Sequence, residues 1–375
     1  MTYLAITGQK NLALAELETR FTNISDIGDA IVINTDKKID INNFGSIIKL
    51  AVQIEIKSSN LSEDIANIIE SKYSKNSLSS IDFAISNYTK TKLIHIESEV
   101  KKILQSRGIK SRFVRTNGKP LNAASVIYNN LVKKGVEIII CGNSNNLNLA
   151  ETIAVQDINS YTKRDMDRPR KDLKVGMFPP KLAQIVINLA SPNQNEIIFD
   201  PFCGSGVILQ EGLLQDYNVL GSDIEDDMVY NSQKNLEWLM TQYDIDSNFT
   251  LKTQDAKNIK NYPSSPYVIC TEGFLGKVFK ELPSKAEIDS VSADLKQIYI
   301  DFFKGLKKLN NQPKTISITL PCWRQKNSVI NLNIVDQILK LGYTIKQLKT
   351  VDSTGLIYLR ENQIVGRQLL VFKPI

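Results

Sequence analysis

The feature that most constrains the fold is a glycine loop after a short apolar run, with the sequence Asp200-Pro201-Phe202-Cys203-Gly204-Ser205-Gly206. The run at residues 197–199 predicts a buried parallel strand, and the glycines allow a tight turn before a helix begins. A second apolar run at residues 218–221 is followed by Asp223, which predicts a carboxylate at the end of the neighbouring strand. Since a carboxylate at that place can hold a ribose diol, the sequence predicts a Rossmann-like α/β domain with a nucleoside pocket.

The glycine loop lacks the third glycine that dinucleotide binding requires. A G-x-G-x-x-G loop places a pyrophosphate on a helix N-terminus, but here Gly206 is followed by three aliphatic residues. Asp200 would also repel a pyrophosphate, whereas a carboxylate suits a ligand that carries an ammonium and a sulfonium. The sequence therefore indicates S-adenosylmethionine as the cofactor, and a different Rossmann-like domain stays open as the alternative.

These residues resemble the cofactor loop of class I methyltransferases, in the form found among enzymes that methylate exocyclic nitrogens of nucleic-acid bases. The resemblance implies that Asp223 binds the ribose and that Asp255, which ends the next expected strand, binds the adenine amine. Cys203 is expected to be an inert wall residue, because its neighbours are apolar. The residues expected to contact the cofactor are Asp200, Phe202, Cys203, Gly204, Gly206, Asp223, Ile224, Asp255 and Ala256.

Length and composition predict a soluble protein of two or three domains, with 375 residues of which 42% are hydrophobic. No apolar run approaches the roughly 20 residues of a membrane span, and the N-terminal residues predict a first strand rather than a signal peptide, so a cytosolic location is expected. The four cysteines are scattered and the single histidine is His95, which predicts no disulfide framework and no metal site. His95 is expected to face solvent from a strand.

Positive charge is concentrated in the middle of the chain. Residues 90–181 hold 18 Lys or Arg against 8 Asp or Glu, a balance of +10, which leaves −4 for all other residues. Such a region predicts salt-dependent contact with a polyanion, with an ordinary solvated surface as the alternative. The residues expected to contact RNA phosphates are Arg112, Arg115, Lys119, Lys163, Arg164, Arg168 and Arg170.

The N-terminal half predicts small α+β units. Residues 1–50 are expected to form a ferredoxin-like unit. In residues 51–160, four motifs resemble the THUMP domain of RNA-modifying enzymes: Gly108-Ile109-Lys110-Ser111-Arg112-Phe113-Val114, Leu121-Asn122-Ala123-Ala124-Ser125-Val126, Lys134-Gly135-Val136-Glu137 and Thr152-Ile153-Ala154-Val155-Gln156-Asp157. The elements expected there are helices at 61–72, 100–106 and 122–132 and strands at 83–85, 93–96, 112–115 and 136–140.

The C-terminal half predicts a class I methyltransferase domain at residues 176–375, after a polar linker at 161–175 in which Pro169 discourages helix. The alternation of strands and helices after the linker is typical of a doubly wound parallel sheet. Residues 176–183, with prolines at the first turn of a helix, resemble the helix that precedes the cofactor strand in such enzymes.

Over its full length the chain resembles THUMP-containing tRNA guanine-N2-methyltransferases. The resemblance includes Tyr358-Leu359-Arg360-Glu361 and Val365-Gly366-Arg367 near the C-terminus. It implies tRNA as the partner and methylation at the junction of the acceptor and D stems. A helper subunit is neither indicated nor excluded.

The expected catalytic loop departs from the family pattern. N-methyltransferases carry Asp-Pro-Pro-Tyr after the fourth strand, whereas this chain has Thr271-Glu272-Gly273-Phe274-Leu275-Gly276. Glu272 is expected to accept the amine hydrogens of the target base and Phe274 to stack on its ring, and Thr271 is the third residue expected at the catalytic site. The extra methylene of Glu272 and the glycine that follows it are expected to loosen the geometry.

Two alternatives to the amine methyltransferase stay open. Cys322 follows the expected fifth strand, where pyrimidine C5-methyltransferases place a nucleophilic cysteine. Alternatively, decay of the Asp-Pro-Pro-Tyr motif would leave an RNA-binding protein without turnover. The intact cofactor loop favours an enzyme over such a binding module.

Overall fold

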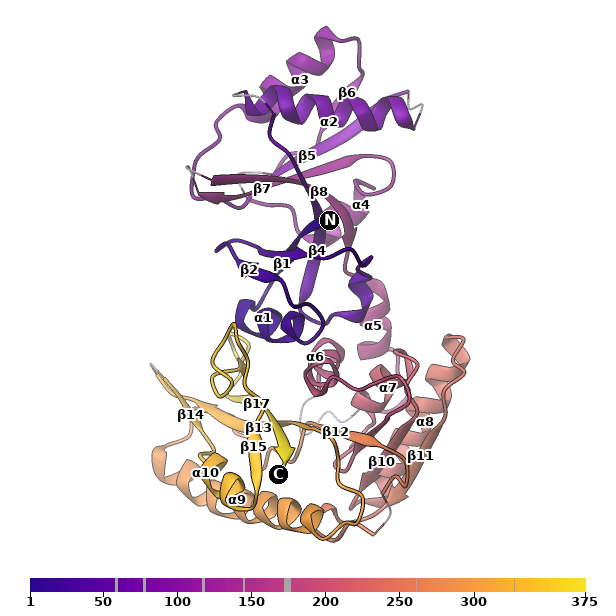
Figure 1. Cartoon of the computed structure of the whole chain (residues 1–375), viewed down its shortest axis with the longest axis vertical. Coiled ribbons are helices and arrows are strands. Elements are labelled where there is room, and N and C mark those ends of the chain that lie inside the picture. The colour runs from indigo at the N-terminus through magenta and orange to yellow at the C-terminus, as the bar shows by residue number, and fades with distance from the viewer. Residues whose placement is uncertain are drawn as a thin grey trace. The chain divides into compact units, whose positions relative to one another are not determined.

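The computed structural model describes residues 1–57, 60–76, 79–116, 119–143, 146–171, 177–260, 262–326 and 328–375. The chain divides into two compact units, which Figure 1 shows in the indigo-to-magenta and the magenta-to-yellow parts of the ribbon. The first unit comprises Met1–Leu17, Phe21–Asn42 and Ser46–Ile158, and the second comprises Glu18–Arg20, Asn43–Gly45 and Asn159–Ile375.

The first unit is built on one eight-stranded sheet with the strand order β2-β3-β1-β4-β8-β7-β5-β6. Strand β1 pairs antiparallel with both β3 and β4, and β4 pairs antiparallel with β8. The regions 1–50 and 51–160 therefore contribute strands to the same sheet. The strands are β1 (Thr2–Thr7), β2 (Ile24–Asp26), β3 (Ile31–Asn34), β4 (Ile47–Ile54), β5 (Ile81–Asn87), β6 (Ser111–Phe113), β7 (Val136–Asn143) and β8 (Asn146–Val155).

Helices cover both faces of this sheet at its β5 and β7 end. Phe83 and Ile85 of β5 lie in a buried cluster with residues of α2 and α3, whereas Ala84 lies in another cluster with Val126 of α4. Because successive strand residues point to opposite faces, α4 lies on the face opposite to α2 and α3. The helices are α1 (Lys10–Glu18), α2 (Leu61–Lys75), α3 (Ile96–Ser106) and α4 (Ala123–Tyr128), with a 3₁₀ turn η1 at Ile41–Asn43.

Two expectations for residues 1–175 are wrong, and one strand of this region was not expected. Residues 93–96 form no strand, because Ile96 begins α3 as a buried residue and His95 precedes it with a left-handed φ of 67°. The ten-residue strand β8 was not expected, although it joins β4 to β7. The expected linker begins as a helix, α5 (Ile158–Met166), and Pro169 lies beyond its end.

The second unit contains a nine-stranded sheet whose main path is β11-β10-β9-β12-β13-β17-β15. The first five strands of this path are parallel, as expected of a doubly wound sheet, whereas β17 is antiparallel to β13 and to β15. The strands are β9 (Ile197–Asp200), β10 (Val219–Asp223), β11 (Phe249–Thr253), β12 (Tyr267–Thr271), β13 (Ile316–Arg324), β14 (Val329–Asn331), β15 (Tyr343–Ile345), β16 (Ile357–Tyr358) and β17 (Val365–Pro374).

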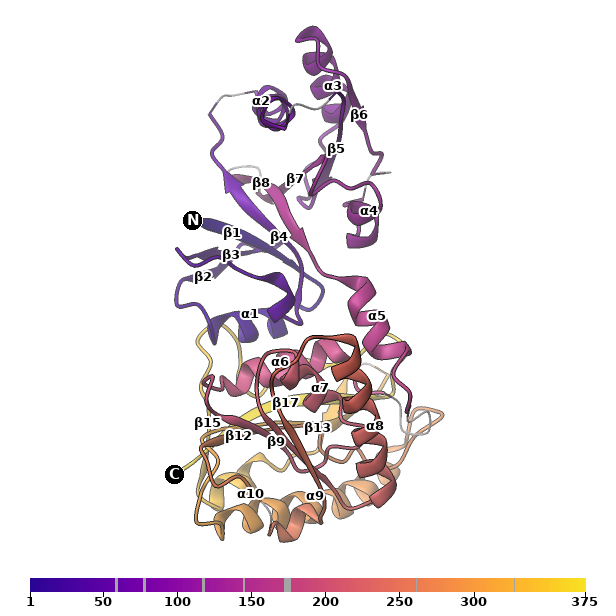
Figure 2. The ribbon, with the colours of Figure 1, turned by 90° about the vertical axis from the view of Figure 1, so that its right-hand side faces the viewer.

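Within this unit, helices α6 and α7 lie on one face of the sheet and α9 and α10 on the other (Figure 2). Helix α6 begins with Pro180 at its first position, where the missing N–H costs nothing. Gly176, expected before this helix, lies outside the described residues. The helices are α6 (Pro180–Ala190), α7 (Val207–Leu213), α8 (Asp226–Gln242), α9 (Lys285–Lys307) and α10 (Val335–Lys340), with a 3₁₀ turn η2 at Ala256–Asn258.

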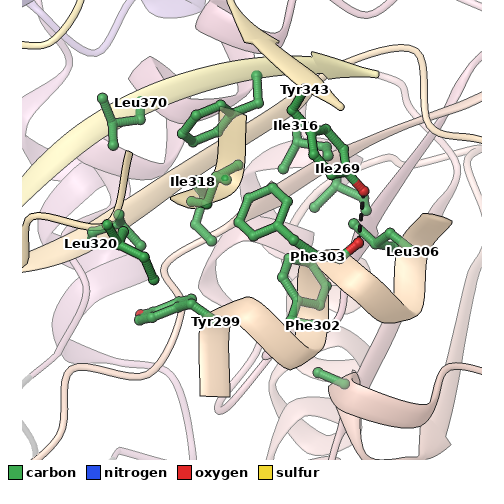
Figure 3. Close-up of a cluster of buried hydrophobic side chains, with 14 of the residues drawn as sticks. Ile269, Tyr299, Phe302, Phe303, Leu306, Ile316, Ile318, Leu320, Tyr343 and Leu370 are labelled. Atoms are coloured by element: carbon green, nitrogen blue, oxygen red, sulfur yellow. Dashed lines mark hydrogen bonds between the residues drawn. The ribbon is translucent and has the colours of Figure 1, made fainter. Parts of the chain in front are cut away.

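The core on the α9 side of this sheet is a cluster of buried hydrophobic side chains from α9 and the strands (Figure 3). Phe302 and Phe303 point from α9 toward Ile318 of β13, and all three are fully buried. The Tyr343 hydroxyl donates a hydrogen bond of 2.8 Å to the Phe303 carbonyl oxygen. A capping box at Ser284 fixes the start of α9. This packing fixes α9 against the strands whose carboxyl ends carry the candidate site.

Candidate active site

A cavity of about 400 Å³ lies at the carboxyl ends of the parallel strands of the second unit. Five acidic residues line it, and four of them stand at strand ends: Asp200 ends β9, Asp223 ends β10, Asp255 follows β11 and Glu272 follows β12. These residues meet because parallel strands end at the same edge of a sheet. Of the expected cofactor and catalytic residues, the ones that line the cavity are Asp200, Phe202, Cys203, Gly204, Asp223, Ile224, Asp255, Ala256, Glu272 and Phe274.

The glycine loop forms one wall of the cavity. Gly204 has a φ of 49°, and its N–H donates a hydrogen bond of 2.9 Å to Asp223 Oδ2, which joins the loop to the end of β10. Gly206 precedes α7 with a φ of 83°, and a Cβ at this position would lie 2.4 Å from Ser232 Oγ. Gly206 does not itself line the cavity and instead allows the turn into α7.

Asp200 is a buried carboxyl group without a cationic partner among the described residues. It is 2% exposed, and both of its hydrogen bonds end on Oδ1, from the Thr271 hydroxyl at 2.6 Å and the Phe202 N–H at 3.1 Å. Burial raises the pKa of Asp200 to about 7, the two hydrogen bonds oppose this, and the carboxylates of Asp223 and Glu272 add to it. A ligand that carries positive charge would stabilise the ionised form of this group.

The loop after β12 is held at three points. The Gly273 N–H donates to the Thr271 hydroxyl oxygen at 3.3 Å, Thr319 of β13 donates to the Glu272 carbonyl at 2.7 Å, and Tyr299 of α9 donates to the Phe274 carbonyl at 2.8 Å. Phe274 is 49% exposed and lines the cavity. The loop is therefore fixed by neighbouring elements, contrary to the loosening expected from its glycine.

Thr271 has a different place from the one expected. It is fully buried, does not line the cavity and connects Asp200 to the loop through its hydroxyl. We therefore assign Thr271 to positioning, because it has no surface that could touch a substrate.

Glu272 forms an ion pair with Arg367 of β17. Arg367 Nε and Nη2 lie 2.7 Å and 2.6 Å from the same oxygen, Oε1, so Oε2 has no hydrogen bond among the described residues. Burial raises the pKa of Glu272, and Arg367 opposes this shift. The Arg367 side chain is 3% exposed, and its guanidinium lies 5.5 Å from the ring centre of Phe178.

The sequence did not single out Arg367 as a site residue. Its place depends on the antiparallel pairing of β17 with β13, in which Arg367 lies opposite Pro321. Other cavity residues that the sequence did not single out are Met177, Phe178, Glu225, Met228, Lys257, Leu275 and Ile298. Met177 and Phe178 belong to the motif around Pro179 and Leu275 to the loop after β12, but the sequence indicates no role for any of these residues.

Asp255 serves as the N-cap of η2. Its Oδ1 accepts a hydrogen bond of 2.9 Å from the Lys257 N–H, and Lys257 Nζ lies 3.5 Å from Oδ2. The turn that follows β11 thereby holds Asp255 at the cavity, which is the place expected for an adenine-binding carboxylate.

Cys203 of the glycine loop and Cys322 of β13 are both buried. Burial raises the pKa of Cys203 well above its ordinary value and raises that of Cys322 to about 12. Cys203 lines the cavity, as expected of a wall residue, whereas Cys322 is fully buried and does not line it. A protonated thiol without access to the cavity does not suit a nucleophile.

The basic residues fall into exposed and buried groups. Arg115, Lys119 and Arg170 are exposed, Lys163 is partly exposed, and Arg112 is exposed while paired with Asp82.

Two of the arginines are unsuited to the expected phosphate contacts. Arg164 is buried in an ion pair with Glu211, with Nε and Oε1 2.6 Å apart, and Arg168 is 2% exposed. Neither guanidinium can reach a phosphate in this conformation, so the expectation is wrong for both residues. Arg164 is buried because it lies on α5 and pairs with Glu211 of α7, and the sequence predicts no helix at this position.

In the part of the chain that the structure describes, no group of three or more His, Cys, Asp and Glu side chains could hold a metal ion. Nor does any helix in those ranges have the length and apolar character needed to cross a membrane.

Comparison with known proteins places the chain among methyltransferases. A family model described as a DNA methylase of the N6/N4 type matches residues 72–234. Among solved structures, TrmN from Thermus thermophilus has a TM-score of 0.51 at 13% identity, and both chains are covered completely. The putative methyltransferase SMU.472, solved in complex with SAH, has a TM-score of 0.50 at 12% identity, with 98% of this chain and 97% of that chain covered. These likenesses show the class I methyltransferase fold.

Sequence relatives identify the family. The tRNA (guanine(10)-N2)-dimethyltransferase of Methanocaldococcus jannaschii is 25% identical over 70% of this chain and 81% of its own length. A probable tRNA (guanine(10)-N2)-dimethyltransferase of Methanothermococcus thermolithotrophicus is 30% identical over 34% of this chain and 74% of its own length. The chain therefore belongs to the tRNA guanine-N2-methyltransferase family.

Proposed function

We propose that this protein transfers methyl groups from S-adenosylmethionine to the exocyclic N2 amine of a guanine in tRNA. Family membership supports the reaction and the substrate class. The relatives are named for guanine 10, and we propose the same nucleotide, at the junction of the acceptor and D stems. Because tRNA is the substrate, we propose a cytoplasmic location.

The residues of the cavity fit S-adenosylmethionine. The observation that carries this assignment is Asp200, a buried carboxyl group whose Oδ2 has no hydrogen bond among the described residues and which has no cationic partner there. A ligand that carries an ammonium and a sulfonium supplies the missing positive charge. We propose that Asp223 accepts the ribose hydroxyls and Asp255 the adenine amine, with Ile224 and Ala256 beside the adenosine. When bound, the cofactor supplies an electrophilic methyl group.

Positioning of the guanine amine is the main task of the protein in this reaction, because the displacement needs little acid or base catalysis. Glu272 Oε2 is the oxygen that we propose accepts an amine hydrogen, since Arg367 occupies Oε1. The carbonyl oxygens of Glu272 and Phe274 already accept hydrogen bonds from Thr319 and Tyr299 and hold the loop. The exposed ring of Phe274 is available to stack on the base.

We take the first unit as the THUMP-type RNA-binding part, on the motifs of its sequence. The exposed Arg115, Lys119 and Arg170, together with Arg112 and Lys163, remain our proposed phosphate contacts. Binding to folded tRNA should then weaken steeply with salt, and charge removal at these residues should weaken it without changing cofactor affinity. Association that does not respond to salt would contradict these phosphate contacts.

Mass spectrometry of nucleosides tests the proposed function. Unmodified tRNA is incubated with protein and S-adenosylmethionine, digested to nucleosides, and compared with a tRNA in which guanine 10 is replaced by adenine. We expect N2-methylguanosine or N2,N2-dimethylguanosine from the first tRNA only, and the mass distinguishes one methyl group from two. Methylation that persists after the replacement would move the target elsewhere, and a C5-methylpyrimidine would support the Cys322 alternative.

A further inference from the structure

A second cavity, of about 610 Å³, adjoins the first. The two cavities share Met177 and Leu275 in their walls, and the Glu272–Arg367 ion pair joins a residue that lines the first to a residue that lines the second. The second cavity lies between the loop that follows β12 and the turn that joins β16 to β17. A base that reaches Glu272 therefore has this cavity beside it.

Basic residues outnumber acidic ones in the wall of the second cavity. Lys277, Arg360 and Arg367 line it together with one acid, Glu361. Arg367 is committed to its ion pair, but Lys277 and Arg360 are exposed and have no ion pair within 4.0 Å among the described residues. Arg360 donates through Nε to the Tyr358 hydroxyl at 2.8 Å, which leaves both of its Nη groups without a hydrogen bond there. Two cationic groups are thus available to a ligand.

The turn that carries Arg360 is held in place from β13. Arg324 donates from Nε to the Gln363 carbonyl at 2.9 Å and from Nη2 to the Arg360 carbonyl at 2.7 Å. The Gln363 N–H donates to the same Arg360 carbonyl at 3.0 Å. Because the backbone is fixed before any ligand binds, less conformational entropy is lost on binding.

We propose that this second cavity binds the phosphodiester of the target nucleotide in tRNA, with Arg360 and Lys277 as its phosphate ligands. The proposal rests on the proposed function and names a substrate contact next to the catalytic loop. A guanidinium with two free Nη groups matches two phosphate oxygens, and a lysine ammonium adds a point charge. Such contacts fix the position of the nucleotide and take no part in methyl transfer.

The test compares Arg360→Gln, Lys277→Gln and the double variant with wild type. Lys340→Gln is the matched control, because Lys340 is exposed and lines neither cavity. For the double variant we expect the tRNA concentration that gives half-maximal methylation to rise about tenfold or more, with kcat within about twofold of wild type. The slope of log affinity against log salt should decrease by about 1 for each phosphate ligand that is removed. Cofactor affinity, measured by calorimetry, should not change.

Each outcome decides the proposal. If wild type methylates tRNA and the double variant keeps the same half-saturating concentration and salt slope, the second cavity is not a phosphate site, and the proposed function stands. If wild type methylates no tRNA, the proposed function fails. Filter binding of tRNA to wild type and the variants still measures the slope of log affinity against log salt. If that slope is the same in the double variant as in wild type, the second cavity is not a phosphate site. Weakened cofactor binding in the double variant would also overturn it, by assigning the cavity to the cofactor.

Discussion

Binding of S-adenosylmethionine should depend on pH through Asp200. The pKa of this carboxyl group is raised to about 7, mainly by burial, with the Asp223 and Glu272 carboxylates adding to the shift. A cationic ligand favours the ionised form, so the pKa in the complex lies below that of the free protein. Affinity is therefore full above pH 7 and decreases as the pH falls below 7, by up to about tenfold for each unit.

The magnitude follows from the ionised fraction. With a pKa of about 7, Asp200 is about three-quarters ionised at pH 7.5 and about 3% ionised at pH 5.5. Affinity should then differ by up to about 25-fold, or about 1.9 kcal/mol, between these pH values. Binding at pH 5.5 should release up to about one proton from the protein.

Calorimetry at both pH values, in buffers with different ionisation enthalpies, measures affinity and proton release together. In the Asp200→Asn variant, which has no proton to release at this position, the pH dependence should disappear. 5′-Methylthioadenosine, which lacks the ammonium and the sulfonium, is the ligand control and should bind wild type equally at both pH values. Equal affinity of wild type for S-adenosylmethionine at pH 7.5 and 5.5, or the same pH slope in Asp200→Asn, would refute this reasoning.

Three further predictions concern the same cavity. Glu272→Ala should lower the single-turnover methylation rate about a hundredfold or more, whereas Cys322→Ala should leave it nearly unchanged; the reverse ranking would indicate pyrimidine C5 chemistry. Arg367→Gln should raise the pKa of Glu272 further and move the acidic limb of the kcat profile to higher pH, and Arg367→Lys should partly restore it; an unmoved limb would show that the ion pair does not control the ionisation of Glu272 during turnover. Asp223→Ala should weaken S-adenosylmethionine binding in calorimetry, and an unaffected variant would remove Asp223 from the ribose site.

The acidic wall of the first cavity could be predicted from the sequence, because its residues belong to short motifs of the chain. Asp200 and Gly204 belong to one loop, and Asp223 and Asp255 each follow a strand that the apolar pattern identifies. Parallel strand order then brings their ends to one edge without further information. Short-range signals therefore determine most of this half of the cavity.

Two buried ion pairs could not be predicted, because each joins residues that are far apart in the sequence. Lys49 of β4 is buried against Glu137 of β7, which also accepts hydrogen bonds from the hydroxyls of Ser86 and Thr152. From the sequence alone, Lys49 is expected on the surface, because a lysine is rarely buried without an acidic partner. The sequence does not show that Glu137 lies beside it. Arg367 is the equivalent case at the active site, because only the pairing of β17 brings it to Glu272.

Gly273 shows why the comparison with Asp-Pro-Pro-Tyr gave a misleading account of the loop. Glu272 takes the place of the acid and Gly273 that of the first proline, but Gly273 has a φ of 71°, whereas proline is locked near −65°. A Cβ at residue 273 would also lie 2.6 Å from the Tyr299 hydroxyl, the group that holds the Phe274 carbonyl. The loop is therefore a different backbone conformation rather than a weakened copy of the family motif.

Gly273→Ala should disturb this loop in a way that separates backbone strain from the loss of a hydrogen bond. The left-handed φ costs an alanine about 1 kcal/mol, and displacement of the Tyr299 hydroxyl removes one hydrogen bond, which costs about 1 kcal/mol more. Urea unfolding should show a total loss of about 2 kcal/mol, and single-turnover methylation should slow because Glu272 moves with the loop. Tyr299→Phe alone should remove only the hydrogen bond, and adding it to Gly273→Ala should cost less than the sum of the two single changes, because the clash is with the same hydroxyl. Strict additivity of the two changes would show that residue 273 and Tyr299 do not touch, and wild-type methylation by Gly273→Ala would show that the conformation of this loop does not position Glu272.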